Sequence, residues 1–590
     1  MQSITSRRRS VALRLIFPIS CIVVMSLVFS GGNAHAATPK KHHNPLLNAT
    51  ISPHKASSTK AISRYNLLLN STADEGDITD PADAPAALCA TYTKNPYDRP
   101  FPNVDMITGD TTVTVGTQTG CKSAQNETTI AVNPRNPNNL VAGTNDYRVF
   151  NSRENRNDGS GWAYTTKDGG KTWLNVQLPH LTFQTGATGA LSDMDSAGDP
   201  SISFGPNNTV YYANLVFSRL NSGSGIVVSI SHDGGVTWGE PSIVHLDGVD
   251  SSGNGVSTLV NNDKEWVAVD PRNSQIAYVT WTTFLYDSSG NYVSSPIVVS
   301  VTHDGGKSWS APKQVTPAFT PGGIAPYDQG SNPVVDRNGT LYVAYEGTIC
   351  QDLSCSAATD HDEVIVAKST DGGLTFTNAL VDTDYDFPNN PHVGRETLTG
   401  ENFRINSFPQ LTIDRVTNQL YVTWADDRNG QYDANGNSVK TNGDAFVASS
   451  LTGSDWSGEI TVGSSSDEVY PAVAAFAGHV LITFYTRAYD PTGINLDYAF
   501  VPVLALGPHH LLGLHLTRIT RQSENPQVQF VAQDLVDTNN YLQGVFIGDY
   551  TAVAAGSDGI FHPCWTDFRG NPGLTLPNQD AYTQAIWNAW

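Results

Sequence analysis

Four short stretches of the sequence share one pattern: TKDGGKTW at 166–173, SHDGGVTW at 231–238, THDGGKSW at 302–309 and STDGGLTF at 369–376. The hydroxyl and the aspartate can accept hydrogen bonds from the backbone amides of a turn, and glycine adopts the positive φ that such a turn needs. The aromatic residue at the end can fold back into a core. The pattern predicts four tight β-hairpin turns. A fifth stretch, SSLTGSDW at 449–456, keeps the spacing but lacks the aspartate.

Each copy belongs to a longer unit. The unit begins with two apolar strands joined by a polar turn, as in WVAVDP at 266–271 followed by IAYVTW at 276–281. A third strand then leads into the repeat stretch. The polar turns between these first two strands recur at intervals of 62 to 80 residues, near Asn133, Gly205, Asp270, Asp336, Asp414, Phe476 and Gly556. Short β-branched and aromatic runs with almost no helical periodicity predict an all-β chain of seven repeated units.

The repeats resemble the Asp-box repeats (S/T-x-D-x-G-x-T-W) of bacterial neuraminidases, in the sialidase superfamily. The resemblance runs from about residue 121 to the C-terminus and implies a β-propeller of four-stranded blades. We expect seven blades, with six, the usual number in sialidases, as the alternative. The last unit ends soon after its third strand, at 580–583. Residues 86–120 are therefore candidates for its outer strand, and the propeller is expected to occupy residues 86–590.

The N-terminus has the features of a secretory signal peptide over residues 1–36. Arginines precede an apolar run from Leu15 to Phe29, and Ala34-His35-Ala36 provides a small-residue cleavage pattern. An uncleaved anchor is the alternative, although the run is short for a membrane span. Residues 37–85 are rich in Ser, Thr, Pro and Asp, which predicts a disordered linker. We expect a secreted, extracellular monomer with no membrane span after cleavage.

The composition excludes some functions. The chain has 590 residues with Lys+Arg 34 against Asp+Glu 56, a net charge of −22 that repels nucleic acid. Of the 6 cysteines, Cys350 and Cys355 can close a small loop and Cys89 can pair with Cys121, whereas Cys564 is expected to be a buried thiol in a strand. No cysteine and histidine spacing indicates zinc.

The two ends of a propeller carry different turns. The turns after the first and third strands share one face, which makes the four repeat aspartates structural: Asp168, Asp233, Asp304 and Asp371. The opposite face collects many Asp and Arg residues, which are either repeated salt bridges or a binding site for an acidic sugar, because Arg grips a carboxylate bidentately.

One unit resembles the sialidase active-site motifs further. It contains FRIN at 403–406, LYVTWADDR at 420–428 and Asp433 five residues later. The resemblance implies that Arg404 and Arg428 bind the substrate carboxylate and that Asp433 is the catalytic acid/base. Arg487 or Arg569 would be a third substrate-binding arginine. Sialidases use a tyrosine nucleophile, for which Tyr550 is a candidate, with Tyr327 and Tyr489 also on loops beside acids.

No cofactor is expected to be required, and no metal site is predicted. A surface Ca²⁺ near Asp382–Asp386, or near Asp193, Asp195 and Asp199, is an alternative to ordinary acidic loops. The leading hypothesis is a secreted sialidase-like glycoside hydrolase that removes a terminal acidic sugar from sialylated or other acidic glycans. The alternative is a non-catalytic propeller that binds glycan or protein on the face opposite the Asp boxes.

Overall fold

The computed structural model describes residues 103–107, 123–153, 156–289, 292–317, 327–349, 361–385, 387–390, 395–432, 438–527, 531–536, 542–544, 546–569, 579–587 and 589. The chain divides into two compact units, Met1–His42 and His43–Trp590, and every described residue lies in the second. The predicted signal peptide, the predicted linker, four of the cysteines (Cys89, Cys121, Cys350 and Cys355) and Asp433 lie outside the described residues.

The described chain forms seven four-stranded antiparallel blades, which confirms the predicted all-β propeller and the seven-blade count. The first four blades are β2 (Gln125–Val132), β3 (Leu140–Asn151), β4 (Arg156–Thr166) and β5 (Leu174–Gln177); β6 (Ser196–Phe204), β7 (Val210–Phe217), β8 (Ser224–Ser231) and β9 (Ser242–Asp247); β10 (Val260–Val269), β11 (Ala277–Tyr286), β13 (Ile297–Thr302) and β14 (Lys313–Gln314); and β15 (Gln329–Val335), β16 (Leu341–Ile349), β17 (His361–Ser369) and β18 (Thr377–Asp384).

The last three blades are β21 (Gln410–Ile413), β22 (Leu420–Asp426), β25 (Asp444–Ser450) and β26 (Ile460–Val462); β27 (Glu468–Phe476), β28 (His479–Thr486), β29 (Asp497–Gly507) and β30 (His510–Gly513); and β34 (Ala552–Ala555), β35 (Phe561–Asp567), β36 (Asp580–Thr583) and β1 (Val104–Asp105). In the seventh blade β1 is the outer strand, with Val104 opposite Thr583 and Asp105 opposite Tyr582. A segment from before the first blade thus completes the last one.

The inner strands form a closed ring. β2 contacts both β6 and β34, and the contacts continue through β10, β15, β21 and β27 back to β34. Buried apolar side chains fill the spaces between neighbouring blades, because each sheet has an apolar face on both sides. Fully buried tryptophans occupy the second strands of the third, fifth and seventh blades: Trp281, Trp424 and Trp565. Cys564 is a buried free thiol on β35, as predicted.

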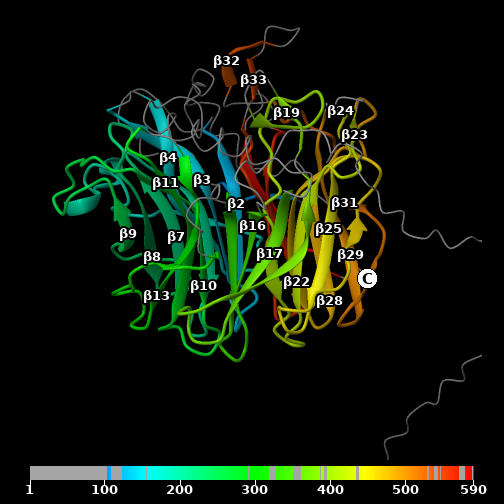
Figure 1. Cartoon of the computed structure of the whole chain (residues 1–590), viewed down its shortest axis with the longest axis horizontal. Helices are drawn as coiled ribbons and strands as arrows, with labels where there is room; N and C mark the ends of the chain where they lie inside the picture. The colour runs from blue at the N-terminus through cyan, green and yellow to red at the C-terminus, as the bar shows by residue number, and fades with distance from the viewer. Residues whose placement is uncertain are drawn as a thin grey trace, which may run out of the picture. The chain divides into compact units, whose positions relative to one another are not determined.

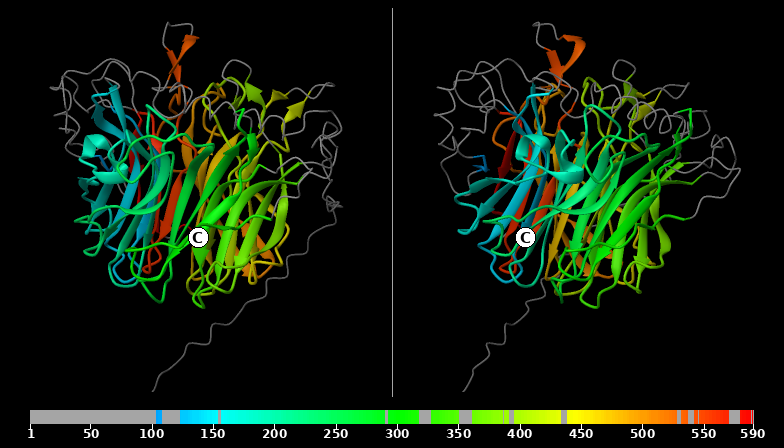
Figure 2. Two further views of the ribbon diagram at one scale, coloured as in Figure 1. Left: turned by 60° about the vertical axis from the view of Figure 1, so that its left-hand side comes forward. Right: turned by 90° about the vertical axis from the view of Figure 1, so that its left-hand side faces the viewer.

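Smaller elements lie between the blade strands. They are η3 (Phe183–Thr185), η4 (Gly189–Leu191), β12 (Tyr292–Ser294), β31 (Thr517–Arg518), and the hairpins β19 (Asn389–Asn390) with β20 (Arg395–Glu396), β23 (Gln431–Tyr432) with β24 (Ser438–Lys440), and β32 (Val531–Val536) with β33 (Leu542–Gly544). These three hairpins lie together at one end of the blades (Figures 1 and 2). No helix in the described ranges has the length and apolar character of a membrane span.

The four repeat stretches form the turns that the sequence predicts. In the first, the Asp168 Oδ1 accepts the backbone N–H groups of Lys171 and Thr172, each at 3.0 Å, and its Oδ2 accepts the Thr172 hydroxyl at 2.7 Å. The other three aspartates bond their turns in the same way. In the fifth stretch the Thr452 hydroxyl accepts the N–H groups of Ser454 and Asp455, so a threonine takes the place of the aspartate.

Candidate functional site

The antiparallel strand order gives each blade two chemically different ends. We call the end with the four repeat turns the DGG face. The opposite end, which carries the connections between second and third strands and between blades, is the loop face, and the three small hairpins lie on it (Figure 1). Arg404, Arg428, Arg487, Arg569 and Tyr550 all lie on connections or strand ends of this loop face.

Bulges at the starts of the inner strands carry polar side chains at equivalent positions. The pairing registers of β2, β6, β10 and β27 shift at these points. The bulged residues have a positive φ: Glu127 at 54°, Asp199 at 51°, Lys264 at 51° and Tyr470 at 53°. A non-glycine residue in this region is strained, and such strain often marks a functional or structural centre.

Three of these residues take part in a buried charge cluster. Lys264 Nζ lies 2.7 Å from Glu127 Oε1, 2.6 Å from Asp549 Oδ2 and 3.4 Å from Asp199 Oδ2. Arg404 donates to both oxygens of Asp549, at 2.7 and 2.6 Å. We call Glu127, Asp199, Lys264, Arg404 and Asp549 the axial charge cluster. Burial alone would raise the pKa of Asp549, but Arg404 and Lys264 hold it well below its usual range.

Tyr550 packs beside this cluster. Its hydroxyl donates to the carbonyl of Pro200 at 3.2 Å, and its ring packs edge-on against Trp266 with a centroid separation of 5.1 Å. Lys264 Nζ lies 5.3 Å from the centre of the same ring. Tyr550, the nucleophile candidate from the sequence, is therefore hydrogen-bonded to a backbone carbonyl, and it bridges the seventh and second blades.

Arg428 and Arg569 share a repeated local arrangement. Each pairs with the aspartate two residues before it, Asp426 or Asp567, and lies over an aromatic ring of the third strand. Arg148 repeats it in the first blade, with Asp146 at 2.6 Å and the Trp162 ring centroid at 3.9 Å. Arg428 also contacts Asp382 Oδ2 at 2.9 Å. The pairing of each arginine with the aspartate two residues before it is the repeated salt bridge that the sequence offered as the alternative to a sugar-binding site.

Arg487 links the fifth and sixth blades. Its guanidinium lies 2.8 Å from Asp467 Oδ2 and 2.8 Å from Glu401 Oε1. Asp467 also accepts the N–H of Gly443 at 2.9 Å. Burial raises the pKa of Glu401 to about 7 although Arg487 opposes the shift.

Other carboxyl groups nearby also have raised pKa values. Burial raises the pKa of Asp427 to about 7, that of Asp444 to about 6 and that of Glu468 to about 8. Asp427 Oδ2 accepts the Tyr432 hydroxyl at 2.7 Å, and its Oδ1 accepts the Asn442 N–H at 2.8 Å. We call Glu401, Asp427, Asp444 and Glu468 the loop-face carboxylates. Carboxyl groups titrating near neutral pH are frequent in active sites.

The predicted arginines fall into separate groups. Arg404 belongs to the axial charge cluster, Arg428 and Arg487 contact the loop-face acids of the fifth and sixth blades, and Arg569 pairs with Asp567 and Glu524 in the seventh. Asp433 directly follows Tyr432 in the chain and lies outside the described residues. Arg404 and Arg428 thus have different carboxylate partners.

Sequence reasoning missed the pairing of Tyr432 with Asp427 and the position of Lys264 at the centre of the axial charge cluster. Tyr432 directly precedes the predicted acid Asp433, and that position was the available signal. Lys264 stands six residues before its polar turn, as Glu127 and Asp199 do before theirs. Among the described residues, no group of three or more His, Cys, Asp or Glu side chains is arranged to hold a metal ion, and Asp382 is paired with Arg428.

No protein-family model matches the sequence, and no curated protein matches it. Solved structures do match. A Hadza microbial sialidase is 13% identical over 73% of each chain, with a TM-score of 0.39. The intramolecular trans-sialidase of Ruminococcus gnavus is 10% identical over 80% of this chain and 96% of that one, with a TM-score of 0.39. The GH93 α-L-arabinofuranosidase of Fusarium graminearum is 13% identical over 64% of this chain and 93% of that one, with a TM-score of 0.37. Likeness at this level assigns no activity to the chain.

Proposed function

We propose that the protein is a glycoside hydrolase that removes a terminal acidic sugar, with its reacting groups on the loop face of the fifth blade. The observation that carries this proposal is the 2.7 Å hydrogen bond from the Tyr432 hydroxyl to Asp427. A tyrosine paired with a carboxylate is the nucleophile that suits an acidic sugar, since the sugar's own carboxylate repels an anionic nucleophile.

The proposed reaction has two steps, each with two proton transfers. The Tyr432 oxygen attacks the anomeric carbon while Asp427 accepts the phenol proton, and Asp433 donates a proton to the departing glycosidic oxygen. Water then displaces the tyrosine: Asp433 accepts a proton from the water, and Asp427 returns its proton to the departing Tyr432 oxygen. The raised pKa of Asp427, about 7, suits a group that exchanges a proton near neutral pH.

The arginines would bind the sugar carboxylate by exchanging partners. Arg487 is bonded to Glu401, whose pKa of about 7 means that mildly acidic conditions protonate this carboxyl and weaken its hold on Arg487. Arg428 lies on the same connection as Asp427 and Tyr432, so both arginines are candidates for this role. The leader-like N-terminus supports secretion, so the proposed substrates are extracellular glycans.

The test is hydrolysis of a fluorogenic sialoside. Tyr432→Phe and Asp433→Ala are expected to lower kcat/KM by about a hundredfold or more, because each removes a group that transfers a proton or forms a bond. Arg428→Lys is expected to lower it by about tenfold. The matched control is Arg148→Lys, which breaks the same Asp-x-Arg arrangement in the first blade and should keep full activity. Equal losses in the two lysine variants would contradict a binding role for Arg428.

A second function, binding of acidic glycans without cleavage, is favoured by a different observation. All four predicted substrate-binding arginines are already paired with carboxylates of the chain. Saturable binding of a sialylated oligosaccharide with no turnover, and binding that is unaffected by Tyr432→Phe, would support this alternative over the hydrolase.

A further inference from the structure

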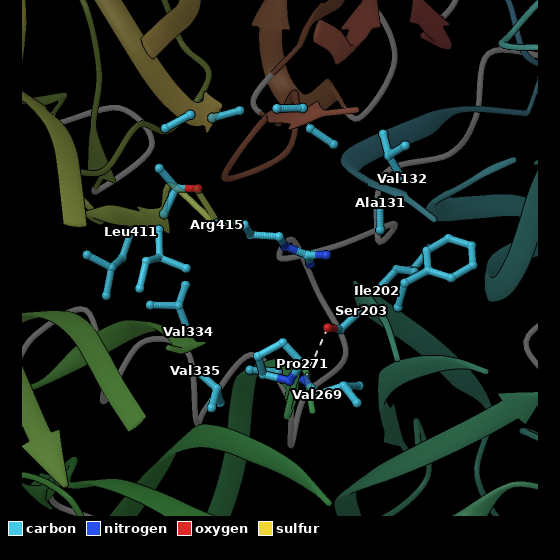
Figure 3. Close-up of a pocket in the computed structure, with 18 of the residues that line it drawn as sticks. Ala131, Val132, Ile202, Ser203, Val269, Pro271, Val334, Val335, Leu411 and Arg415 are labelled. Carbon is cyan, nitrogen blue, oxygen red and sulfur yellow. Dashed lines mark hydrogen bonds between the residues drawn. The ribbon is translucent and has the colours of Figure 1, made fainter. Parts of the chain in front are cut away.

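An axial channel opens on the DGG face, away from the proposed active site. It has a volume of about 420 Å³ and is lined by the inner strands of all seven blades. Val132, Ile202, Val269, Val334 and Leu411 form much of its wall (Figure 3). A pocket of this size, with both apolar and polar groups in its wall, is within the range of small-molecule sites.

Arg415 lines this channel. Arg415 extends its guanidinium into the open space (Figure 3). Among the described residues, its side chain has no hydrogen bond and no ion pair, and it remains exposed to the channel. The surrounding protein lowers the pKa of Arg415 by desolvation. A guanidinium that has no ion pair among the described residues is available to bind an anion in the channel.

A second arginine lines the same channel from the neighbouring blade. Arg337 occupies the position in the fourth blade that Arg415 occupies in the fifth, one residue after the polar turn aspartate. The two turns touch, because Asn418 Nδ2 donates to Asp336 Oδ2 at 3.3 Å. The Arg337 side chain also has no ion pair within the described ranges. Both arginines therefore line the same channel, on adjacent turns.

The acids of this rim already bond backbone amides. Asp414 Oδ1 accepts the N–H of Val416 at 2.8 Å, and its Oδ2 accepts that of Gly478 at 2.6 Å. Asp336 Oδ1 accepts the N–H groups of Asn338 and Thr340, each at 2.8 Å. These carboxylates hold their own turns, and neither makes an ion pair with Arg415 or Arg337 in the described structure.

The inner end of the channel leads toward Trp266, which lines it and packs against Tyr550. Tyr550 in turn bonds Pro200 across the axis. The wall residues begin three or four positions before the polar turns, whereas Glu127, Asp199 and Lys264 of the axial charge cluster stand six positions before theirs. A ligand in the channel would therefore meet apolar walls and Trp266, with the arginines at the outer rim.

We propose that this channel binds an amphipathic organic anion, with its carboxylate or phosphate head on Arg415 and Arg337 and its apolar body against the inner strands. Guanidinium groups bind such oxyanions in a bidentate manner, and the apolar walls favour a hydrocarbon body over water. This site is separate from the proposed active site and does not depend on hydrolase activity.

The test is calorimetric titration of the purified protein with octanoate. We expect saturable binding at one site per chain, weakened by about tenfold or more in Arg415→Met, since a charge-assisted hydrogen bond is lost. The control is Arg272→Met, an arginine of the same face that is paired with Asp270 and should leave octanoate binding unchanged. Octyl phosphate should behave as octanoate does, whereas acetate, which lacks an apolar body, should bind far more weakly.

Three results would overturn the proposal: no saturable octanoate binding to the wild-type protein, equal binding to Arg415→Met, or acetate binding as tight as octanoate binding. A folding defect would not obscure the result, because unfolding of each variant is measured alongside. Arg415→Met should unfold as the wild-type protein does in the absence of ligand, since the exposed Arg415 side chain has no ion pair among the described residues to lose.

Discussion

The turn aspartates of the DGG face and the loop-face carboxylates differ in acidity. On the DGG face, burial opposes ionisation of Asp168 and Asp233, but the hydroxyl and amide hydrogen bonds of their turns lower each pKa to about 2. On the loop face, burial raises the pKa of Asp427 to about 7 and that of Glu468 to about 8. The difference shows that hydrogen bonds from the turn fix a structural charge, whereas burial without enough donors leaves a group ready to exchange a proton.

We expect the largest change in stability from a substitution in the axial charge cluster. Lys264→Met leaves Glu127, Asp199 and Asp549 buried with one cation fewer, and we expect a loss of about 3–5 kcal/mol in the free energy of unfolding. Urea denaturation measures it. Arg272→Met on the DGG face removes an ion pair whose arginine side chain is 50% exposed, and it should cost about 1 kcal/mol or less. Similar losses in the two variants would show that the axial cluster is no more important than a surface pair.

Glu468 tests the contribution of the loop face to pH-dependent stability. Its pKa is raised from 4.5 to about 8 in the folded protein, so the native state binds this proton more tightly than the unfolded chain. The resulting stability is fully present below about pH 4.5 and is lost as the pH rises toward 8, by at most about 1.4 kcal/mol per pH unit for one group. Glu468→Gln should therefore flatten this part of the stability curve. An unchanged slope would contradict the raised pKa.

Asp168 tests the opposite dependence on the DGG face, with a smaller expected effect. Because its folded-state pKa is lowered to about 2, its contribution is present above about pH 4 and is lost as the pH falls toward 2. Asp168→Asn should therefore be less stable than the wild-type protein at pH 6 and equal to it near pH 2. A stability difference that persists unchanged at pH 2 would mean that the carboxylate charge is not what stabilises the turn.

The fold could be predicted because its signals are local. Asp168 bonds groups within four residues of itself, so the eight-residue pattern contains the whole turn. The regular spacing of polar turns then gives the seven blades. For Arg428 the sequence offered a salt bridge only as the alternative to a substrate-binding role, and the partner in the structure is Asp426, two residues away.

The ion pairs of the candidate site could not be predicted in this way, because most of them join residues that are far apart in the sequence. Arg404 and Asp549 are 145 residues apart, and Lys264 and Glu127 are 137 apart. Motif comparison placed Arg404 and Arg428 together, yet it contained no information on which carboxylates would neutralise them. Tyr432 and Asp427 are only five residues apart, but the connection that brings them into contact has no pattern that predicts its conformation.

The pH dependence of kcat/KM for hydrolysis of an acidic glycoside tests the account most directly. If Asp427 accepts the Tyr432 proton, the wild-type activity should rise as the pH increases through about 7, the pKa of Asp427. Asp168→Asn on the opposite face should keep that profile, whereas Asp427→Asn should lose both the rise and most of the activity. An Asp427→Asn variant with the activity and the pH profile of the wild-type protein would contradict the assignment of chemistry to the loop-face carboxylates.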